Sequence, residues 1–172
     1  KSTGYIEFVR KIETYIYNGS KSLLNQGYVS NAIDYANESG NQEIINSIVK
    51  DVNTTINNAM NNNPKLALDY ANQYSKSTGD ISINNKVKTE ISNRAKNSLK
   101  VGDASNAINY ASKSGNQEII DSVIKDMFTT INDSITNNPS LALSYASILD
   151  ESTRQGIIKL GEPNLSNSIE KE

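Results

Sequence analysis

The chain has 172 residues, 36% of them hydrophobic and 6% aromatic, and its formal net charge is −2. This length suits a single domain with a thin core, and the 17 basic residues, scattered among 19 acidic ones, argue against a nucleic-acid partner. There is no His and no Cys, so general-base, thiol and metal-ligand chemistry lack their usual side chains. No apolar stretch approaches the roughly 20 residues that cross a bilayer. We therefore expect no enzyme activity, no cofactor or metal, and no direct membrane insertion.

The first predicted helical hairpin covers about residues 5–39. A long helix is predicted over about 5–25 and a shorter one over about 29–39, from apolar residues at three- and four-residue steps. Gly27 lies in the turn between the two helices, and Gly40 follows the second helix as a stop signal.

The second hairpin, about residues 41–76, has the clearest pattern. Its first helix, from about 41 to 61, carries one apolar stripe: Ile45, Ile48, Val49, Val52, Ile56, Ala59 and Met60. This helix ends in the run Asn61-Asn62-Asn63-Pro64, where an Asn can take the left-handed conformation and Pro can open the next helix. The short second helix then carries Leu66, Ala67, Tyr70 and Ala71.

Two more hairpins are predicted over about 81–114 and 116–149, each with a long first helix and a shorter second one. A last segment, about 152–160, is predicted to be a partial capping helix. Residues 1–161 would then form a single helical-repeat domain, and residues 162–172 a flexible tail with few apolar anchors.

An internal duplication supports this organisation. When the sequence is shifted by 75 positions, Ser30–Ala71 aligns with Ser105–Ala146, and 28 of the 42 positions carry the same residue. Within each copy a shorter motif recurs at spacings of 35, 40 and 35 residues: AIDYA at Ala32, ALDYA at Ala67, AINYA at Ala107 and ALSYA at Ala142. A fixed spacing of this size is typical of stacked repeat units, so four hairpins are predicted, with one Tyr per motif as a core spacer.

The run from Leu99 to Tyr110, in which Gly102 precedes Ala107 by five residues, is similar to the centre of a tetratricopeptide repeat. Gly27 and Ala32 keep this step, and Asn replaces Gly at Asn62 and Asn137, since Asn tolerates positive φ. The resemblance covers about residues 5–150, although the chain lacks Trp and its third unit is 40 residues long. It implies an all-α fold, a right-handed α-α superhelix of about four hairpins with a partial C-terminal cap. Pentatricopeptide repeats share the Gly-to-Ala step but bind RNA, which the net charge of −2 argues against.

The resemblance also implies that the first helix of each hairpin lines a concave surface, so the polar stripe of these helices is the predicted partner-binding site. In the second hairpin the predicted site residues are Lys50, Asn53 and Asn57, and in the fourth they are Lys125, Phe128 and Asn132. Amide and ammonium donors suit a peptide carboxylate or backbone. The alternative is an ordinary solvated face that the duplication preserved.

Phe128 is the most pointed of these candidates, because an aromatic ring replaces Asn53 of the other copy on a stripe that is otherwise polar. An exposed ring among polar neighbours can anchor a partner. The alternative is that the helix is slightly rotated and buries this ring against its neighbour.

These observations favour a non-catalytic scaffold that binds a protein or peptide. The second hypothesis is a structural or surface component, of a cell envelope or a virus, that self-associates through the ends of its repeat stack. The 47 Asn and Ser residues lean toward an extracellular or cell-surface location and leave a cytoplasmic one open.

Overall fold

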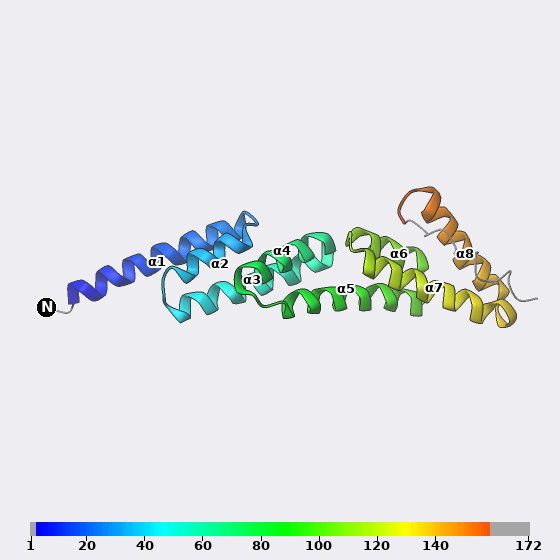
Figure 1. The fold of residues 1–172 in the computed structure, drawn as a ribbon, viewed down its shortest axis with the longest axis horizontal. Coiled ribbons are helices and arrows are strands. Elements are labelled where there is room, and N and C mark those ends of the chain that lie inside the picture. Colours follow the sequence, from blue (N-terminus) through cyan, green and yellow to red (C-terminus); the bar gives the residue numbers. More distant parts are fainter. Residues whose placement is uncertain (1–2, 159–172) are drawn as a thin grey trace, which may run out of the picture. The chain divides into compact units, whose positions relative to one another are not determined.

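The structure is a computed structural model, and it describes residues 3–158 (Figure 1). Within these residues the chain is all-helical, with eight helices and no strand, which confirms the all-α class predicted from the sequence. The helices belong to two compact units, one ending at Ile91 and the other beginning at Ser92, and this division falls inside the fifth helix. The predicted tail, residues 162–172, lies outside the described residues.

The first unit contains α1 (Thr3–Asn25), α2 (Val29–Asn37), α3 (Gln42–Asn62), α4 (Pro64–Thr78) and the first part of α5 (Ser82–Lys100). Helix α1 packs against α2 and α3 packs against α4, so consecutive helices pair as predicted, and α2 also lies against α3 and α4. Because α1 has 23 residues and α2 only nine, the N-terminal part of α1 extends well past its hairpin partner (Figure 1).

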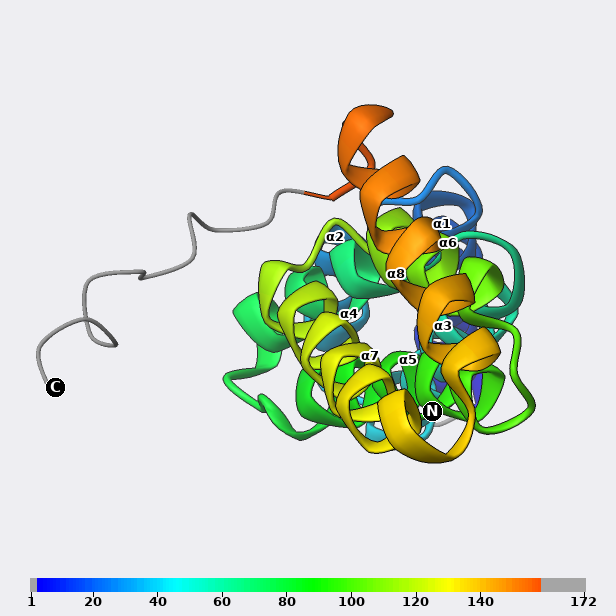
Figure 2. The same ribbon diagram turned by 90° about the vertical axis from the view of Figure 1, so that its right-hand side faces the viewer.

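The second unit contains the rest of α5 together with α6 (Ala104–Lys113), α7 (Gln117–Asn137) and α8 (Pro139–Arg154). Helix α6 lies against both α7 and α8, and α7 packs against α8. Figure 2 shows α7 and α8 joined by the tight turn at Asn138. The observed bounds lie within two residues of the predicted ones for the other helices, but α8 extends to Arg154, past its predicted end at about residue 149.

The helix starts are capped by the same side chains in both copies. Asn63 accepts a hydrogen bond from the backbone N–H of Leu66, and Asn138 accepts one from that of Leu141, at 3.1 and 3.2 Å. Each of these Asn residues precedes a proline in the first turn of the next helix, where the missing N–H costs nothing. Two of the orphan helix-start donors, one in each copy, are thereby satisfied.

The prediction of a left-handed Asn at these turns is wrong. No non-glycine residue among those described has a positive φ. Asn62 and Asn137, which were expected to replace the turn glycine, are the last residues of α3 and α7, and the caps that follow them, Asn63 and Asn138, have φ of −146° and −152°. Only Gly27 and Gly102, with φ of 85° and 84°, take the left-handed conformation in the turns between paired helices. The turns inside successive hairpins therefore alternate between two kinds, a glycine turn and an Asn-Pro turn.

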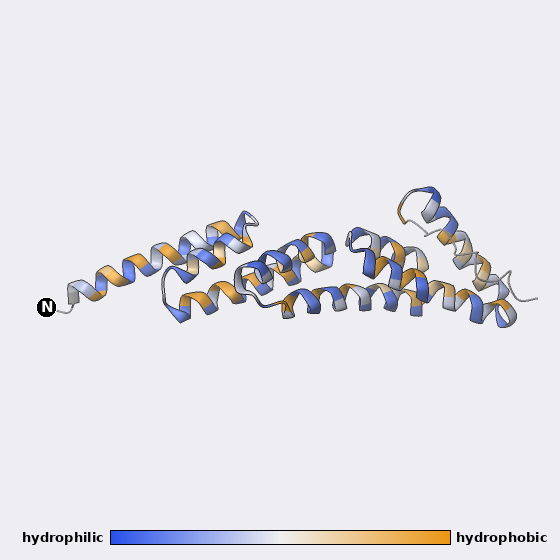
Figure 3. Cartoon of the chain, in the orientation of Figure 1, coloured by the Kyte–Doolittle hydropathy of each residue, from blue (hydrophilic) through white to orange (hydrophobic). Residues whose placement is uncertain are grey.

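The core follows the recurring five-residue motif. Its first Ala is buried in all four hairpins, as Ala32, Ala67, Ala107 and Ala142. The apolar residues of the first helices recur at regular intervals along each helix (Figure 3), and those of α3 and α7 are largely buried. The motif tyrosines differ: Tyr35, Tyr70 and Tyr110 are half-buried, whereas Tyr145 is buried and its hydroxyl donates to the carbonyl oxygen of Leu99 at 3.1 Å.

The segment expected to form a separate capping helix, about 152–160, differs from the prediction. Helix α8 continues without a break through Ser152 to Arg154, and Gln155 is its C-cap. Ser152 is buried, because it lies on the packed side of this same helix. Residues 155–158 form turns and bends, and residues 159–160 lie outside the described part.

Candidate partner-binding surface

The predicted site residues of the first unit lie along the outer side of α3. Lys50 and Asn57 are exposed, and Asn53 is half-buried. The side-chain amide of Asn53 donates to the carbonyl oxygen of Val49 at 3.1 Å, and the Thr54 hydroxyl donates to that of Lys50 at 3.0 Å. The Asn53 and Thr54 side chains are thus hydrogen-bonded to their own helix, which leaves the Lys50 ammonium as the group most available to a partner.

The predicted site residues of the second unit lie at the equivalent places on α7. Lys125 and Asn132 are exposed, and the Thr129 hydroxyl donates to the carbonyl oxygen of Lys125 at 3.1 Å, as Thr54 does in the other copy. Phe128 is 45% exposed, so the ring is not buried against a neighbouring helix. The structure brings Lys125, Phe128 and Asn132 together on one helix face of the second unit, separately from the three residues on α3.

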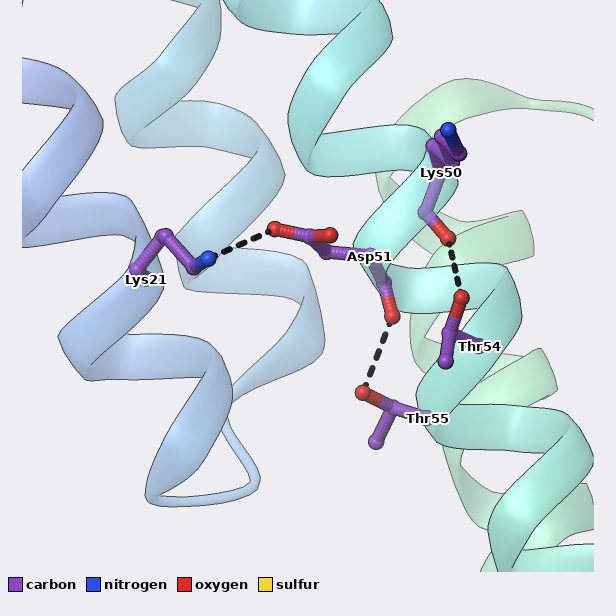
Figure 4. A network of polar contacts seen from close by, with 5 residues as sticks. All are labelled: Lys21, Lys50, Asp51, Thr54 and Thr55. Carbon is purple, nitrogen blue, oxygen red and sulfur yellow. Dashed lines mark hydrogen bonds and ion pairs between the residues drawn. The ribbon is translucent and has the colours of Figure 1, made fainter.

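An ion pair fixes which side of α3 is turned inward. The Lys21 ammonium of α1 lies 3.2 Å from Oδ2 of Asp51 on α3. Figure 4 shows this pair with Lys50 and with the Thr54 and Thr55 hydroxyls, which donate to the carbonyl oxygens of Lys50 and Asp51. Asp51 points toward α1 whereas Lys50 points away from the pair (Figure 4). Since adjacent helical residues are about 100° apart, an inward Asp51 keeps Lys50 on the outer side.

The second unit has the matching pair, in which Lys96 of α5 lies 3.1 Å from Oδ2 of Asp126 on α7. Lys21 and Lys96 are 75 positions apart, as are Asp51 and Asp126. The same ion pair therefore links consecutive first helices in both copies, and it orients Lys125 as it orients Lys50.

The environment of Lys21 favours its charged form. The hydrogen bond with the Asp51 carboxylate raises the pKa of Lys21 above its ordinary value, and Tyr17 contributes in the same direction. The Lys21 ammonium also lies 5.5 Å from the centre of the Tyr17 ring. Because the folded-state pKa is raised, this contribution to stability is present below the ordinary pKa and is lost as the pH rises through the raised one.

Two shallow depressions lie between first helices, one in each unit. That of the first unit, about 400 Å³, is lined by residues of α1 and of the start of α3: Arg10, Glu13, Thr14, Tyr17, Asn41, Glu43, Ile44 and Ser47. That of the second unit, about 240 Å³, lies against the Lys96 and Asp126 pair. None of the six predicted site residues lines either depression, so the stripe and the hollows are neighbouring but distinct surfaces.

Sequence reasoning missed the two ion pairs that link consecutive first helices. Lys21 and Lys96 lie just before the 42-residue block of high identity, so the alignment did not single them out. Lys21 and Lys96 are 75 positions apart, as Asp51 and Asp126 are, and this shared spacing is the signal that could have identified them.

The part of the chain that the structure describes holds no group of potential ligand side chains placed to bind a metal ion. None of the helices in residues 3–158 has a stretch long and apolar enough to cross a membrane. Comparisons of the chain with protein-family models, with curated proteins and with solved structures find no match.

Proposed function

We propose that this protein is a non-catalytic helical-repeat scaffold that binds a protein or peptide partner through the outer stripes of its first helices. In this proposal the four hairpins form a right-handed superhelix of the tetratricopeptide-like kind, and these stripes line its concave face. The paired hairpins and the step from Gly27 to Ala32 and from Gly102 to Ala107 support this arrangement.

The observation that carries the proposal is the exposure of Phe128 beside Lys125. A phenyl ring that is 45% exposed gains little from its own fold and gains more when a partner covers it. Lys125 has no ion-pair partner among the described residues, so its charge is available to a carboxylate of the ligand. An extended or helical peptide with an apolar anchor next to an acidic residue fits this pair of side chains.

Rigid presentation supports binding further. The ion pairs of Asp51 and Asp126 hold the inner side of α3 and α7, so the outer stripe is ordered before a ligand arrives. A preorganised surface pays less conformational entropy on binding than one that must order itself.

A selection of displayed random peptides against the chain tests the proposal. Recovered ligands should combine an apolar residue with a nearby acidic one, and Phe128→Asn should weaken their binding by about tenfold or more. This substitution installs the residue that the other copy carries at Asn53, so the helix should tolerate it. Lys125→Glu should weaken the same ligands, and more so at low salt.

Tyr28→Ala serves as the matched control, because Tyr28 is an exposed aromatic residue in a turn of the first unit, away from the stripe. Its binding should equal that of the unchanged chain. If Phe128→Asn and Lys125→Glu leave the affinity of every recovered peptide unchanged, the assignment of the binding face is wrong.

A further inference from the structure

The N-terminal part of α1 presents an apolar face that no other residue of the described range 3–158 covers. Tyr5, Phe8, Ile12 and Tyr15 are exposed and follow one another at spacings of three and four residues, so they lie on one side of the helix. We call these four residues the leading face. Large apolar side chains gathered in this way on one helix mark an interaction surface more often than single exposed ones do.

The other hairpins show what belongs on this face. Ile12 corresponds to Val87 at the 75-residue shift. Ile48 in α3 and Val123 in α7 have the equivalent position, because each of these four residues lies one helical turn before a buried residue of its own helix. Ile12 is 45% exposed, whereas its three counterparts are at most 3% exposed. Each of those three helices is preceded in the chain by another hairpin, and α1 is not preceded by one in the described residues.

The last hairpin has the opposite exposed surface. The second residue of the five-residue motif is Ile33, Leu68, Ile108 and Leu143 in the four hairpins. The first three are at most 6% exposed, and Leu143 is 72% exposed. The last Ala of the motif behaves in the same way, because Ala36, Ala71 and Ala111 are buried and Ala146 is exposed. We call Leu143 and Ala146, which lie three residues apart on α8, the trailing face.

Within the first unit the corresponding surfaces of neighbouring hairpins already meet. The side-chain amide of Asn84, near the start of α5, donates to the side-chain oxygen of Asn72 on α4. Asn72 directly follows Ala71, the counterpart of Ala146, and Asn84 lies one turn before Val87, the counterpart of Ile12. The second helix of one hairpin therefore lies against the first half of the next hairpin's first helix.

The other junctions are similar. Helix α2 lies against α3 and α4 of the next hairpin, with the backbone N–H of Ser30 donating to the side chain of Gln73 on α4 at 3.4 Å, and α6 lies against α7 and α8 in the second unit. In each case the motif residues of the earlier hairpin are buried. Leading and trailing surfaces are thus complementary wherever both are present.

We propose that the trailing face of one molecule docks on the leading face of a second copy of the same chain, and that this contact repeats the junction between α4 and α5. The contact is heterologous, because each partner contributes a different face. A complex of two molecules still has one free leading face and one free trailing face, so further molecules can add and form short head-to-tail chains. This surface is separate from the outer stripe of α3 and α7, so it stands or falls independently of the proposed peptide binding.

Sedimentation velocity of the full chain across a wide range of concentration tests the proposal, and the mean mass should rise beyond that of a dimer. Ile12→Glu blocks the leading face and Leu143→Glu blocks the trailing face, so each variant alone should stay monomeric. Mixed in equal amounts, they should form one heterodimer and nothing larger, because each supplies the face that the other lacks. Both residues are exposed, so circular dichroism should report the same helix content in both variants as in the unchanged chain.

Val101→Glu is the matched control, since Val101 is an exposed apolar residue in a turn outside both faces, and this variant should assemble like the unchanged chain. A dimer that survives in either single variant would mean a symmetric contact and would overturn the proposal. An unchanged chain that stays monomeric at every concentration would overturn it as well, and would leave the leading face to another occupant, such as a further hairpin joined to the same chain.

Discussion

Helices α4 and α8 share most of the residues of their first two turns but have different surroundings. Both begin with an Asn cap and a proline, and both continue with a Leu-Ala-Leu run, at Leu66 and at Leu141. Leu68 is buried in α4, which packs against α2 and α3, whereas Leu143 of α8 is exposed, and no further hairpin follows α8 within residues 3–158. The same apolar residue is a core side chain in one copy and a surface side chain in the other, so the repeat sequence alone does not set burial.

The largest difference in stability is expected between Leu68→Ala and Leu143→Ala. Removing the buried leucine leaves a cavity and should lower the free energy of unfolding by about 2–5 kcal/mol. Removing the exposed one should change it by less than about 0.5 kcal/mol. Urea unfolding followed by circular dichroism, at a protein concentration where the chain is monomeric, measures both. Equal losses would mean that Leu143 is covered in solution.

Ser20 provides a second contrast, because the other copy has Ala95 at this place and both residues are fully buried. The Ser20 hydroxyl has no hydrogen-bond partner among the described residues, and an unsatisfied buried hydroxyl costs roughly 1–3 kcal/mol. Ser20→Ala should therefore raise the free energy of unfolding by about 1 kcal/mol, measured by urea denaturation. The reverse change, Ala95→Ser, should lower it, and a loss of stability in Ser20→Ala would contradict the burial of an unpaired hydroxyl.

The two Asn caps should be equivalent, since each makes the same hydrogen bond in its own copy. Asn63→Ala and Asn138→Ala should each cost about 1 kcal/mol of stability, because a helix-start N–H loses its partner. The corresponding changes to Ser should restore most of the loss. Thermal unfolding of the four variants provides the comparison, and a harmless Asn63→Ala would show that the proline alone starts α4.

Tyr145 should give the smallest effect, visible only at alkaline pH. Burial raises the pKa of Tyr145 above its ordinary value of 10.0, and the negative charge of Asp103 adds to this. The folded state therefore favours the neutral phenol, so this contribution to stability is complete below about pH 10 and is lost as the pH rises through the raised pKa. The urea concentration at the unfolding midpoint should fall as the pH rises above about 10, and the fall should be shallower in Tyr145→Phe. An equal fall in both proteins would contradict the burial of this phenol.

The sequence was sufficient to predict the local structure. Apolar spacing around Ile48 and Val52, glycines such as Gly27, and the Asn-Pro run at Asn63 determine where helices begin and end through short-range sterics and hydrogen bonds. These causes act over a few residues, so the pattern indicates them directly. The all-α class and the pairing of consecutive helices follow from the same causes.

What could not be predicted depends on neighbours far along the chain. Whether Leu68 or Leu143 is buried depends on the presence of another hairpin, and the exposure of Phe128 depends on the rotation of α7. The ion pair between Lys21 and Asp51 joins residues 30 positions apart on different helices. The left-handed conformation predicted at Asn62 was wrong, because α3 continues through Asn62 and the turn is made by Asn63, which the following proline restricts to negative φ.

The alternation of glycine turns and Asn-Pro turns has a consequence for how such a chain can lengthen. The tetrapeptide Ser30-Asn31-Ala32-Ile33 is identical to the one that starts at Ser105. A copy of residues 30–104 spliced in after Ala104 would therefore place every turn and every helix start next to a flanking sequence of the same kind. A chain that gains or loses this 75-residue segment keeps the alternation of turns inside its hairpins. A chain that gains a single hairpin would instead have two successive hairpins with the same kind of turn.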